Sequence, residues 1–196
     1  MLENFHEAIS KLKTDVDIVL AGLQRDEFDI TLNLQINRAY ENELLEEWQI
    51  VCRDSGSKYR FETFESKELE ILSEHELLWK YNNDCGKLIL KGRAKSTFKT
   101  IGELYKTHHS HTKGYLPFDE LSHYRLDHIL HKGSGLIEGP MPLMESYQKV
   151  LTKNGYPTTL LPFKEDEYYE TRDYKLLLMG NSYVVAKHFS AHKVKG

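Results

Sequence analysis

The sequence has little cysteine and no long apolar run. Its 196 residues include two cysteines, Cys52 and Cys85, and no Cys-x-x-Cys motif, which excludes a zinc knuckle, a thioredoxin-like motif and a disulfide-rich mini-protein. No apolar run approaches the ~18 residues that span a bilayer, so we expect no membrane association. Residues 1–7 lack a basic region followed by an apolar one, which predicts no signal peptide. Together with the low cysteine count, this favours a cytoplasmic location.

Positive charge is not in excess either. The chain has 26 Lys and Arg against 30 Asp and Glu, a formal net charge of −4, which argues against a nucleic-acid-binding protein. The charge is unevenly distributed, however. Residues 41–76 hold eleven acidic and four basic residues (net −7), whereas residues 77–113 hold eight basic and two acidic residues (net +6). Such asymmetry indicates either a binding face or simply different solvated faces.

The length and composition are those of one globular domain. A chain of 22.9 kDa with 12 Tyr and 8 Phe is large enough to bury a core. No segment rich in Pro, Gly or Ser separates two parts of the chain. We therefore predict a single domain over residues 1–196, with a soft internal boundary near 83–86, where the acidic half meets the basic half.

The first third of the sequence predicts a helix followed by strands. Apolar residues at three- and four-residue steps predict an amphipathic helix over 2–23. Strict alternation then predicts strands at 28–36 and 46–53. The sequence Asp-Ser-Gly-Ser at 54–57 predicts a turn, so that 46–53 and a strand from 59 to 63 form a hairpin. Cys52 is expected to be a buried thiol and Cys85 a turn residue, and 68–72 adds a short strand.

Two segments further on share one pattern. A short strand ends in Gly92 and precedes a helix at 96–108, and another ends in Gly139 and precedes a helix at 142–153. The inward positions match at an offset of 46, which indicates two β–Gly–α units and an internal duplication. The residues predicted to point inward are Phe98, Ile101, Leu104 and Tyr105 in the first helix, and Met144, Tyr147, Val150 and Leu151 in the second.

The C-terminal part predicts a closing hairpin. Gly155 suits the position just after a helix, and 158–161 a strand. Strands at 176–179 and 183–189 flank a Gly180-Asn181 turn, and the basic tail 192–196 is expected to fray. The predicted fold class is α+β: a mainly antiparallel sheet built from hairpins, with an N-terminal helix and two β–Gly–α units that pack helices on one face.

One candidate binding site lies where a strand passes into a helix. Gly92, Arg93, Lys95, Ser96 and Thr97 combine a flexible glycine, two cations and two hydroxyls at a predicted helix N-terminus, which suits a phosphate or carboxylate. The spacing is not that of a Walker A motif. The alternative is that Ser96 caps the helix and the cations are only solvated.

A second candidate is a row of histidines and carboxylates. If 119–131 is helical, Asp119, His123, Asp127 and His131 recur at four-residue steps, which suits a divalent metal or a set of ion pairs on a solvated face. The same segment also fits a strand, which would scatter the row. The aromatic residues in the loops at 115–118 and 168–169 suit either partner recognition or attachment of their loops to the core.

The known catalytic patterns are lacking. Gly180-Asn181-Ser182 lies in a predicted hairpin turn and not in a nucleophile elbow. Gly133, Gly135 and Gly139 do not have the dinucleotide-binding spacing, and Cys85 has no adjacent cation to activate it. We therefore assign no catalytic residue and no cofactor, and whether the chain is an enzyme stays open.

The sequence favours a cytoplasmic, non-catalytic binding or regulatory module that acts through protein–protein contacts, with a protein partner or a second copy. The alternative is a protein that binds, or acts on, a small phosphate-containing anion at the Gly92–Thr97 turn. The third hypothesis is a divalent-metal-dependent protein that uses His123, Asp127 and His131.

Overall fold

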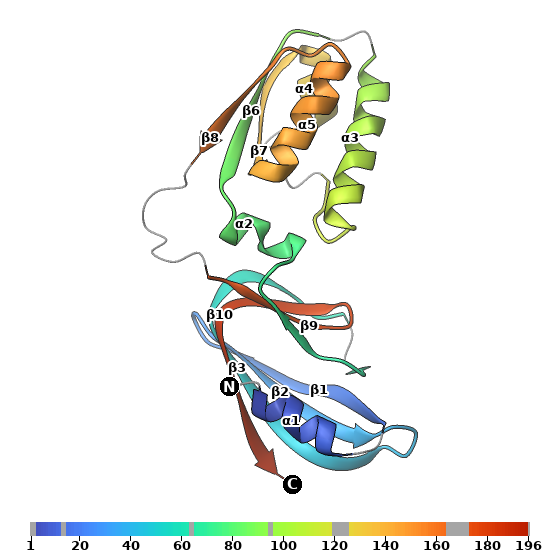
Figure 1. The fold of residues 1–196 in the computed structure, drawn as a ribbon, viewed down its shortest axis with the longest axis vertical. Helices are drawn as coiled ribbons and strands as arrows, with labels where there is room; N and C mark the ends of the chain where they lie inside the picture. The colour runs from blue at the N-terminus through green and yellow to red at the C-terminus, as the bar shows by residue number, and fades with distance from the viewer. Residues whose placement is uncertain are drawn as a thin grey trace. The chain divides into compact units, whose positions relative to one another are not determined.

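The computed structural model describes residues 3–12, 15–62, 65–93, 96–118, 126–163 and 173–195. The chain divides into two compact units (Figure 1). Unit 1 comprises Met1–His75 and Asp173–Gly196, and unit 2 comprises Glu76–Arg172. The predicted α+β class with mainly antiparallel sheets is confirmed. The single-domain prediction stays a prediction, and residues 83–86 lie within unit 2.

Unit 1 contains a seven-stranded antiparallel sheet in the described part of the chain, with strand order β4-β1-β2-β3-β10-β9-β5. Its elements are α1 (Glu3–Lys11), β1 (Val16–Arg25), β2 (Ile30–Arg38), β3 (Glu43–Arg60), β4 (Glu65–Ser66), β5 (Glu70–Leu72), β9 (Lys175–Met179) and β10 (Ser182–Lys195). Alternation builds its core, because every second residue of β2 from Ile30 to Ile36 is buried. Phe5 of α1 packs edge-on against Trp48, with ring centroids 5.2 Å apart.

The predicted helix over 2–23 is wrong beyond its first half. Helix α1 ends at Lys11, and β1 begins at Val16. Val16, Ile18 and Leu20 are buried at every second position, and β1 pairs with β2 along most of its length. The apolar residues between 16 and 23 fit both a helical and a strand period, and pairing with β2 selects the strand because it satisfies the backbone hydrogen bonds.

The predicted hairpin within 46–63 is also wrong. Strand β3 continues through the expected turn to Arg60 and pairs with β10 on one side. Asp54 has a φ of 50°, and the register shifts between Val184 and Ala186, so the turn-forming residues make an irregularity inside one strand. Residues 192–195, expected to fray, are the end of β10 and pair with β3. The closing hairpin with its turn at Gly180 is confirmed.

Unit 2 contains a three-stranded antiparallel sheet in the described residues, with strand order β7-β6-β8. Its elements are the 3-10 turn η1 (Glu76–Leu78), α2 (Trp79–Asn82), β6 (Cys85–Lys91), α3 (Thr97–Thr112), α4 (Leu126–Lys132), β7 (Ser134–Pro140), α5 (Met141–Lys153) and β8 (Thr158–Phe163). Figure 1 shows α3, α4 and α5 on the same side of this sheet. The two predicted strand–helix units are β6–α3 and β7–α5.

Most of the detailed predictions for unit 2 hold. Met144, Tyr147 and Leu151 of α5 are buried as expected, and Val150 is half-buried. Gly155 has a φ of +82° directly after the C-cap residue of α5, which confirms its place. Cys85 is not a turn residue, because it begins β6.

Two further findings concern the cysteines and the membrane prediction. Cys52 is buried as predicted, and neither Cys52 nor Cys85 forms a disulfide. Within the described ranges, no helix has the length and apolar character needed to cross a bilayer.

Candidate functional site

Helix α3 presents two large aromatic side chains to solvent. Its buried side is a row at four-residue steps formed by Thr100, Leu104, His108 and Thr112. On the other side, Phe98 is 88% exposed and Tyr105 is 54% exposed. The prediction that these two residues point inward is therefore wrong, whereas the prediction for Leu104 is confirmed and Ile101 is half-buried.

The sequence pattern predicted the wrong buried side of α3 because three of the four residues buried there are polar. Thr100 donates its hydroxyl hydrogen to the Ser96 carbonyl oxygen at 2.9 Å. The His108 ring lies 2.6 Å from the Leu116 carbonyl oxygen through Nε2 and 2.8 Å from the Tyr147 hydroxyl through Nδ1. Because a carbonyl oxygen only accepts, Nε2 carries the hydrogen, and in the neutral ring Nδ1 then accepts from the Tyr147 hydroxyl. Two of the three polar residues, Thr100 and His108, are thus hydrogen-bonded at positions that an apolar pattern does not predict, whereas Thr112 Oγ1 is buried without a hydrogen-bond partner among the described residues.

The exposed face of α3 combines aromatic and basic groups, and we define it as the α3 surface: Phe98, Lys99, Gly102, Tyr105, Lys106 and His109. All six residues are exposed. The His109 ring stacks on Tyr105, with centroids 6.3 Å apart and planes at 13°. Phe118 meets Tyr105 edge-on at 5.5 Å, so Tyr105 is held in place by rings on two sides.

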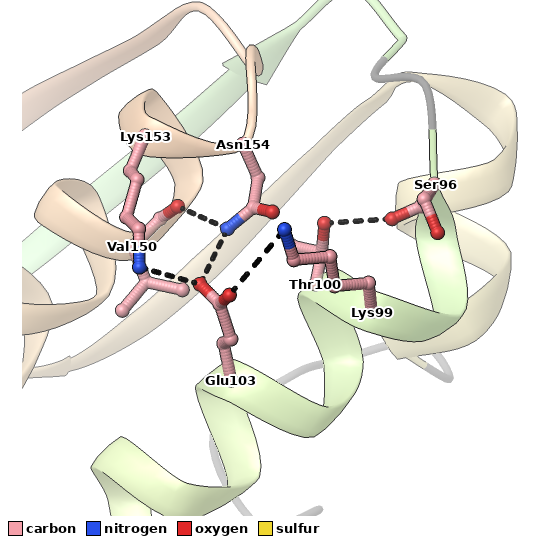
Figure 2. A network of polar contacts seen from close by, with 7 residues as sticks. All are labelled: Ser96, Lys99, Thr100, Glu103, Val150, Lys153 and Asn154. Atoms are coloured by element: carbon pink, nitrogen blue, oxygen red, sulfur yellow. Dashed lines mark hydrogen bonds and ion pairs between the residues drawn. The ribbon is translucent and has the colours of Figure 1, made fainter.

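A polar network fixes α3 against the C-terminal end of α5 (Figure 2). The Glu103 carboxylate accepts a hydrogen bond of 2.8 Å from the Asn154 side-chain amide and lies 3.4 Å from Lys153 Nζ. Asn154 also donates to the Val150 carbonyl oxygen, and Lys99 Nζ lies 4.0 Å from Glu103. The Asn154 hydrogen bond and the nearby lysines lower the pKa of Glu103. The carboxylate therefore stays ionised at neutral pH and holds the two helices in register.

The loop after α3 is attached to the core. Leu116 is buried, and the Phe118 ring packs edge-on against His108 at 5.4 Å and against Tyr147 at 6.5 Å. Of the two alternatives for these aromatic loop residues, the structure therefore shows attachment to the core for Phe118. The second aromatic loop, at 168–169, lies outside the described residues.

The described residues of the predicted anion site each make a separate contact within unit 2. Gly92 has a φ of +99° and donates its N–H to the Gly133 carbonyl oxygen at 2.7 Å. Arg93 Nε donates to the Lys132 carbonyl oxygen at 3.2 Å, at the C-terminal end of α4. Ser96 is the N-cap residue of α3 without a side-chain capping bond, and the Thr97 hydroxyl lies 3.4 Å from the Tyr156 hydroxyl. Lys95 lies outside the described residues, and the anion site stays a prediction.

The histidine row is only partly described. Residues 126–132 form helix α4, so the strand alternative is wrong for this part. Asp127 and His131 lie one turn apart on α4, whereas Asp119 and His123 lie outside the described residues. Among the residues that the structure does describe, no group of three or more His, Cys, Asp or Glu side chains is arranged to hold a metal ion. The metal hypothesis rests on the undescribed part of the row and stays a prediction.

The serine of the Gly-Asn-Ser sequence has a structural role. Ser182 is buried at the start of β10, directly after the hairpin turn. Its hydroxyl oxygen accepts a hydrogen bond of 3.1 Å from the Glu62 backbone N–H. This agrees with the expectation of a hairpin turn in place of a nucleophile elbow.

Comparison of the chain with protein families, with curated proteins and with solved structures finds no match.

Proposed function

We propose that this chain is a non-catalytic binding module that acts through protein–protein contacts, and that the α3 surface is its contact site. The observation that carries the proposal is the 88% exposure of Phe98 beside Lys99 on a helix whose opposite side is fully packed. The partner that fits is a protein with an apolar pocket bordered by carboxylates. The low cysteine content supports action in the cytoplasm.

Aromatic residues are frequent anchors of protein interfaces. Transfer of a phenylalanine side chain from water into an apolar pocket contributes about 1.5–3 kcal/mol, and such anchors commonly carry much of the binding free energy. Phe98 and Tyr105 lie about two turns apart on one helix face, which suits insertion of the helix into a groove. Lys99 and Lys106 stand next to them and favour a partner of opposite charge.

Contacts within unit 2 hold Tyr105 and the middle of α3 in place without a partner. Tyr105 stacks on His109 and meets Phe118 edge-on, and Glu103 connects the helix to Asn154 and Lys153. A surface that is already fixed loses less conformational entropy on binding. These contacts support a contact site on α3 more than on a loose loop.

The proposal can be tested by photo-crosslinking followed by affinity measurement. A chain that carries p-benzoylphenylalanine at position 98 is crosslinked in its native host, and the crosslinked protein is identified and purified. We expect Phe98→Ala and Tyr105→Ala each to raise the Kd for that purified protein at least tenfold. Phe28→Ala is the matched control, because Phe28 is an exposed aromatic residue of unit 1, 65% exposed.

The outcomes separate the possibilities. An unchanged Kd for Phe98→Ala, or an equal loss in Phe28→Ala, contradicts the proposal. Crosslinking only to a second copy of the chain contradicts the acidic partner and makes self-association the role of α3. The small-anion alternative at Gly92–Thr97 stays a separate prediction, tested below.

A further inference from the structure

A recess on the polar face of the unit 1 sheet gathers cationic and hydroxyl groups. It is lined by Arg53 of β3 and by His188, Phe189, Ser190 and His192 of β10, with a volume of about 230 Å³. The five lining residues include no carboxylate. None of them belongs to the α3 surface or to the Gly92–Thr97 turn.

Strand register brings these side chains together from distant parts of the sequence. In the antiparallel pair β3–β10, Arg53 lies opposite His188, and Val51 lies opposite Ser190. His188, Ser190 and His192 follow one another at two-residue steps, so they lie on one face of β10. Between them, Ala191 is buried in the core. The alternation His-x-Ser-x-His in the sequence is the trace of this arrangement.

The recess contains a hydrogen-bonding group with no acceptor in the described structure. Ser190 Oγ is buried, and no described residue forms a hydrogen bond with it. Such groups are rare in folded proteins, because loss of hydration without a replacement bond costs about 1–3 kcal/mol. Because Oγ has almost no contact with solvent, a ligand oxygen in the recess accepts this hydrogen once the neighbouring side chains shift slightly. Arg53, His188 and His192 are exposed and form no ion pair among the described residues, so their donors are available to a ligand.

These groups are the ones that recognise an oxyanion. A guanidinium offers several N–H donors to phosphate oxygens, and each imidazole offers an N–H donor or a positive charge. The recess is smaller than the ~300–1,000 Å³ of sites for drug-sized ligands, so it suits a small group more than a large cofactor. We propose that Arg53, His188, Ser190 and His192 form a binding site for a phosphate group, which is either free phosphate or the terminal group of a small phosphorylated molecule.

Calorimetric titration of the full chain with inorganic phosphate tests this assignment, with AMP as a second probe and sodium chloride as the ionic-strength control. We expect saturable binding of at least one of the two phosphate probes. Arg53→Gln and Ser190→Ala should each raise the Kd at least tenfold. Arg25→Gln and His6→Gln are matched controls, since both residues are exposed in unit 1 outside the recess, and they should leave the Kd within twofold.

Tighter binding of AMP than of inorganic phosphate would show that the site takes a phosphorylated molecule, and the reverse would show that it takes the free anion. Ser190→Ala is the more conservative variant, so the test holds even if Arg53→Gln lowers stability; thermal unfolding of each variant checks this. No saturable binding of either probe, or an unchanged Kd in both recess variants, overturns the proposal.

Discussion

Tyr147 of α5 donates a 2.8 Å hydrogen bond to the buried imidazole of His108 in α3. Burial raises the pKa of the Tyr147 hydroxyl, so the group remains a donor throughout the neutral pH range. We predict that Tyr147→Phe destabilises the protein by about 1–3 kcal/mol, because it leaves His108 Nδ1 without this donor in the core. Urea unfolding measures the change. Tyr105→Phe is the control, because the exposed Tyr105 ring keeps its packing, and an equal effect in both variants would contradict the prediction.

The orientation of α3 gives a second prediction. Leu104 is fully buried, so Leu104→Ala should cost about 2–5 kcal/mol of unfolding free energy through lost burial and a cavity. Phe98→Ala should change that free energy by less than about 0.5 kcal/mol, because its ring contacts solvent. Chemical denaturation of both variants decides the matter. A large loss in Phe98→Ala would restore the inward orientation that the sequence pattern indicated.

Two glycines of unit 2 should respond in opposite directions to alanine. Gly133 has a φ of +75°, and an added Cβ would lie 2.4 Å from Arg93 Cγ and 2.9 Å from the Gly92 carbonyl group. Gly133→Ala should therefore cost more than about 1 kcal/mol. Gly102 lies inside α3 with nothing within 4 Å of that position, so Gly102→Ala should add about 1 kcal/mol of stability. Thermal unfolding of both variants measures the contrast, and a stable Gly133→Ala variant would contradict it.

The buried thiol of Cys52 should lower the stability of the protein as the pH rises above neutral. Burial, followed by the charge of Asp29, raises the pKa of the Cys52 thiol from 9.0 to about 12. Between these values the unfolded chain releases the thiol proton and the native chain keeps it, so stability should fall by up to about 1.4 kcal/mol per pH unit from this group. Urea unfolding at pH 8 and pH 10 should show a smaller decrease for Cys52→Ala than for the unchanged chain. Equal decreases would show that Cys52 does not contribute.

The same phosphate probe distinguishes binding at the Gly92–Thr97 turn from binding in the recess of the unit 1 sheet. Because Arg93 Nε already donates to the Lys132 carbonyl oxygen, we expect Arg93→Ala combined with Lys95→Ala to leave phosphate affinity within twofold. Calorimetry of this double variant, compared with Arg53→Gln, makes the assignment. Loss of binding in the double variant alone would favour the turn as the anion site.

Strands were predicted correctly from the sequence where one hydrophobic period dominated and the pairing strand was close along the chain. The alternation over 30–36 and the hairpin around Gly180 each produce a strand pairing within a few residues. The N-terminal helix was extended too far because residues 16–23 carry two periods at once, and only pairing with β2 resolves them. The turn chemistry at 54–57 became an irregularity in β3 because β10, from the other end of the chain, supplies a pairing partner.

The candidate sites could be predicted only in part for the same reason, because contacts distant in the sequence decide them. Phe98 and Tyr105 fit an inward helical stripe as long as apolar character alone is counted, but Thr100, His108 and Thr112 take the buried positions. Hydrogen bonds with Ser96 for Thr100, and with Leu116 and Tyr147 for His108, compensate for the burial of two of these polar groups. Likewise, Arg53 and His188 are neighbours only through the β3–β10 register, which no local pattern specifies.

Strands β5 and β9 pair directly, with Leu72 opposite Leu176, although the whole of unit 2 lies between them in the chain. In polymer terms β5 and β9 are the two strands of a hairpin whose loop is the whole of unit 2. Loop closure becomes costlier only slowly with length, by about 0.6 kcal/mol for each doubling, so the edge of this sheet can accept an insertion of this size. During synthesis, however, β1, β2 and β3 must wait for the entire second unit to emerge before β9 and β10 can complete their sheet.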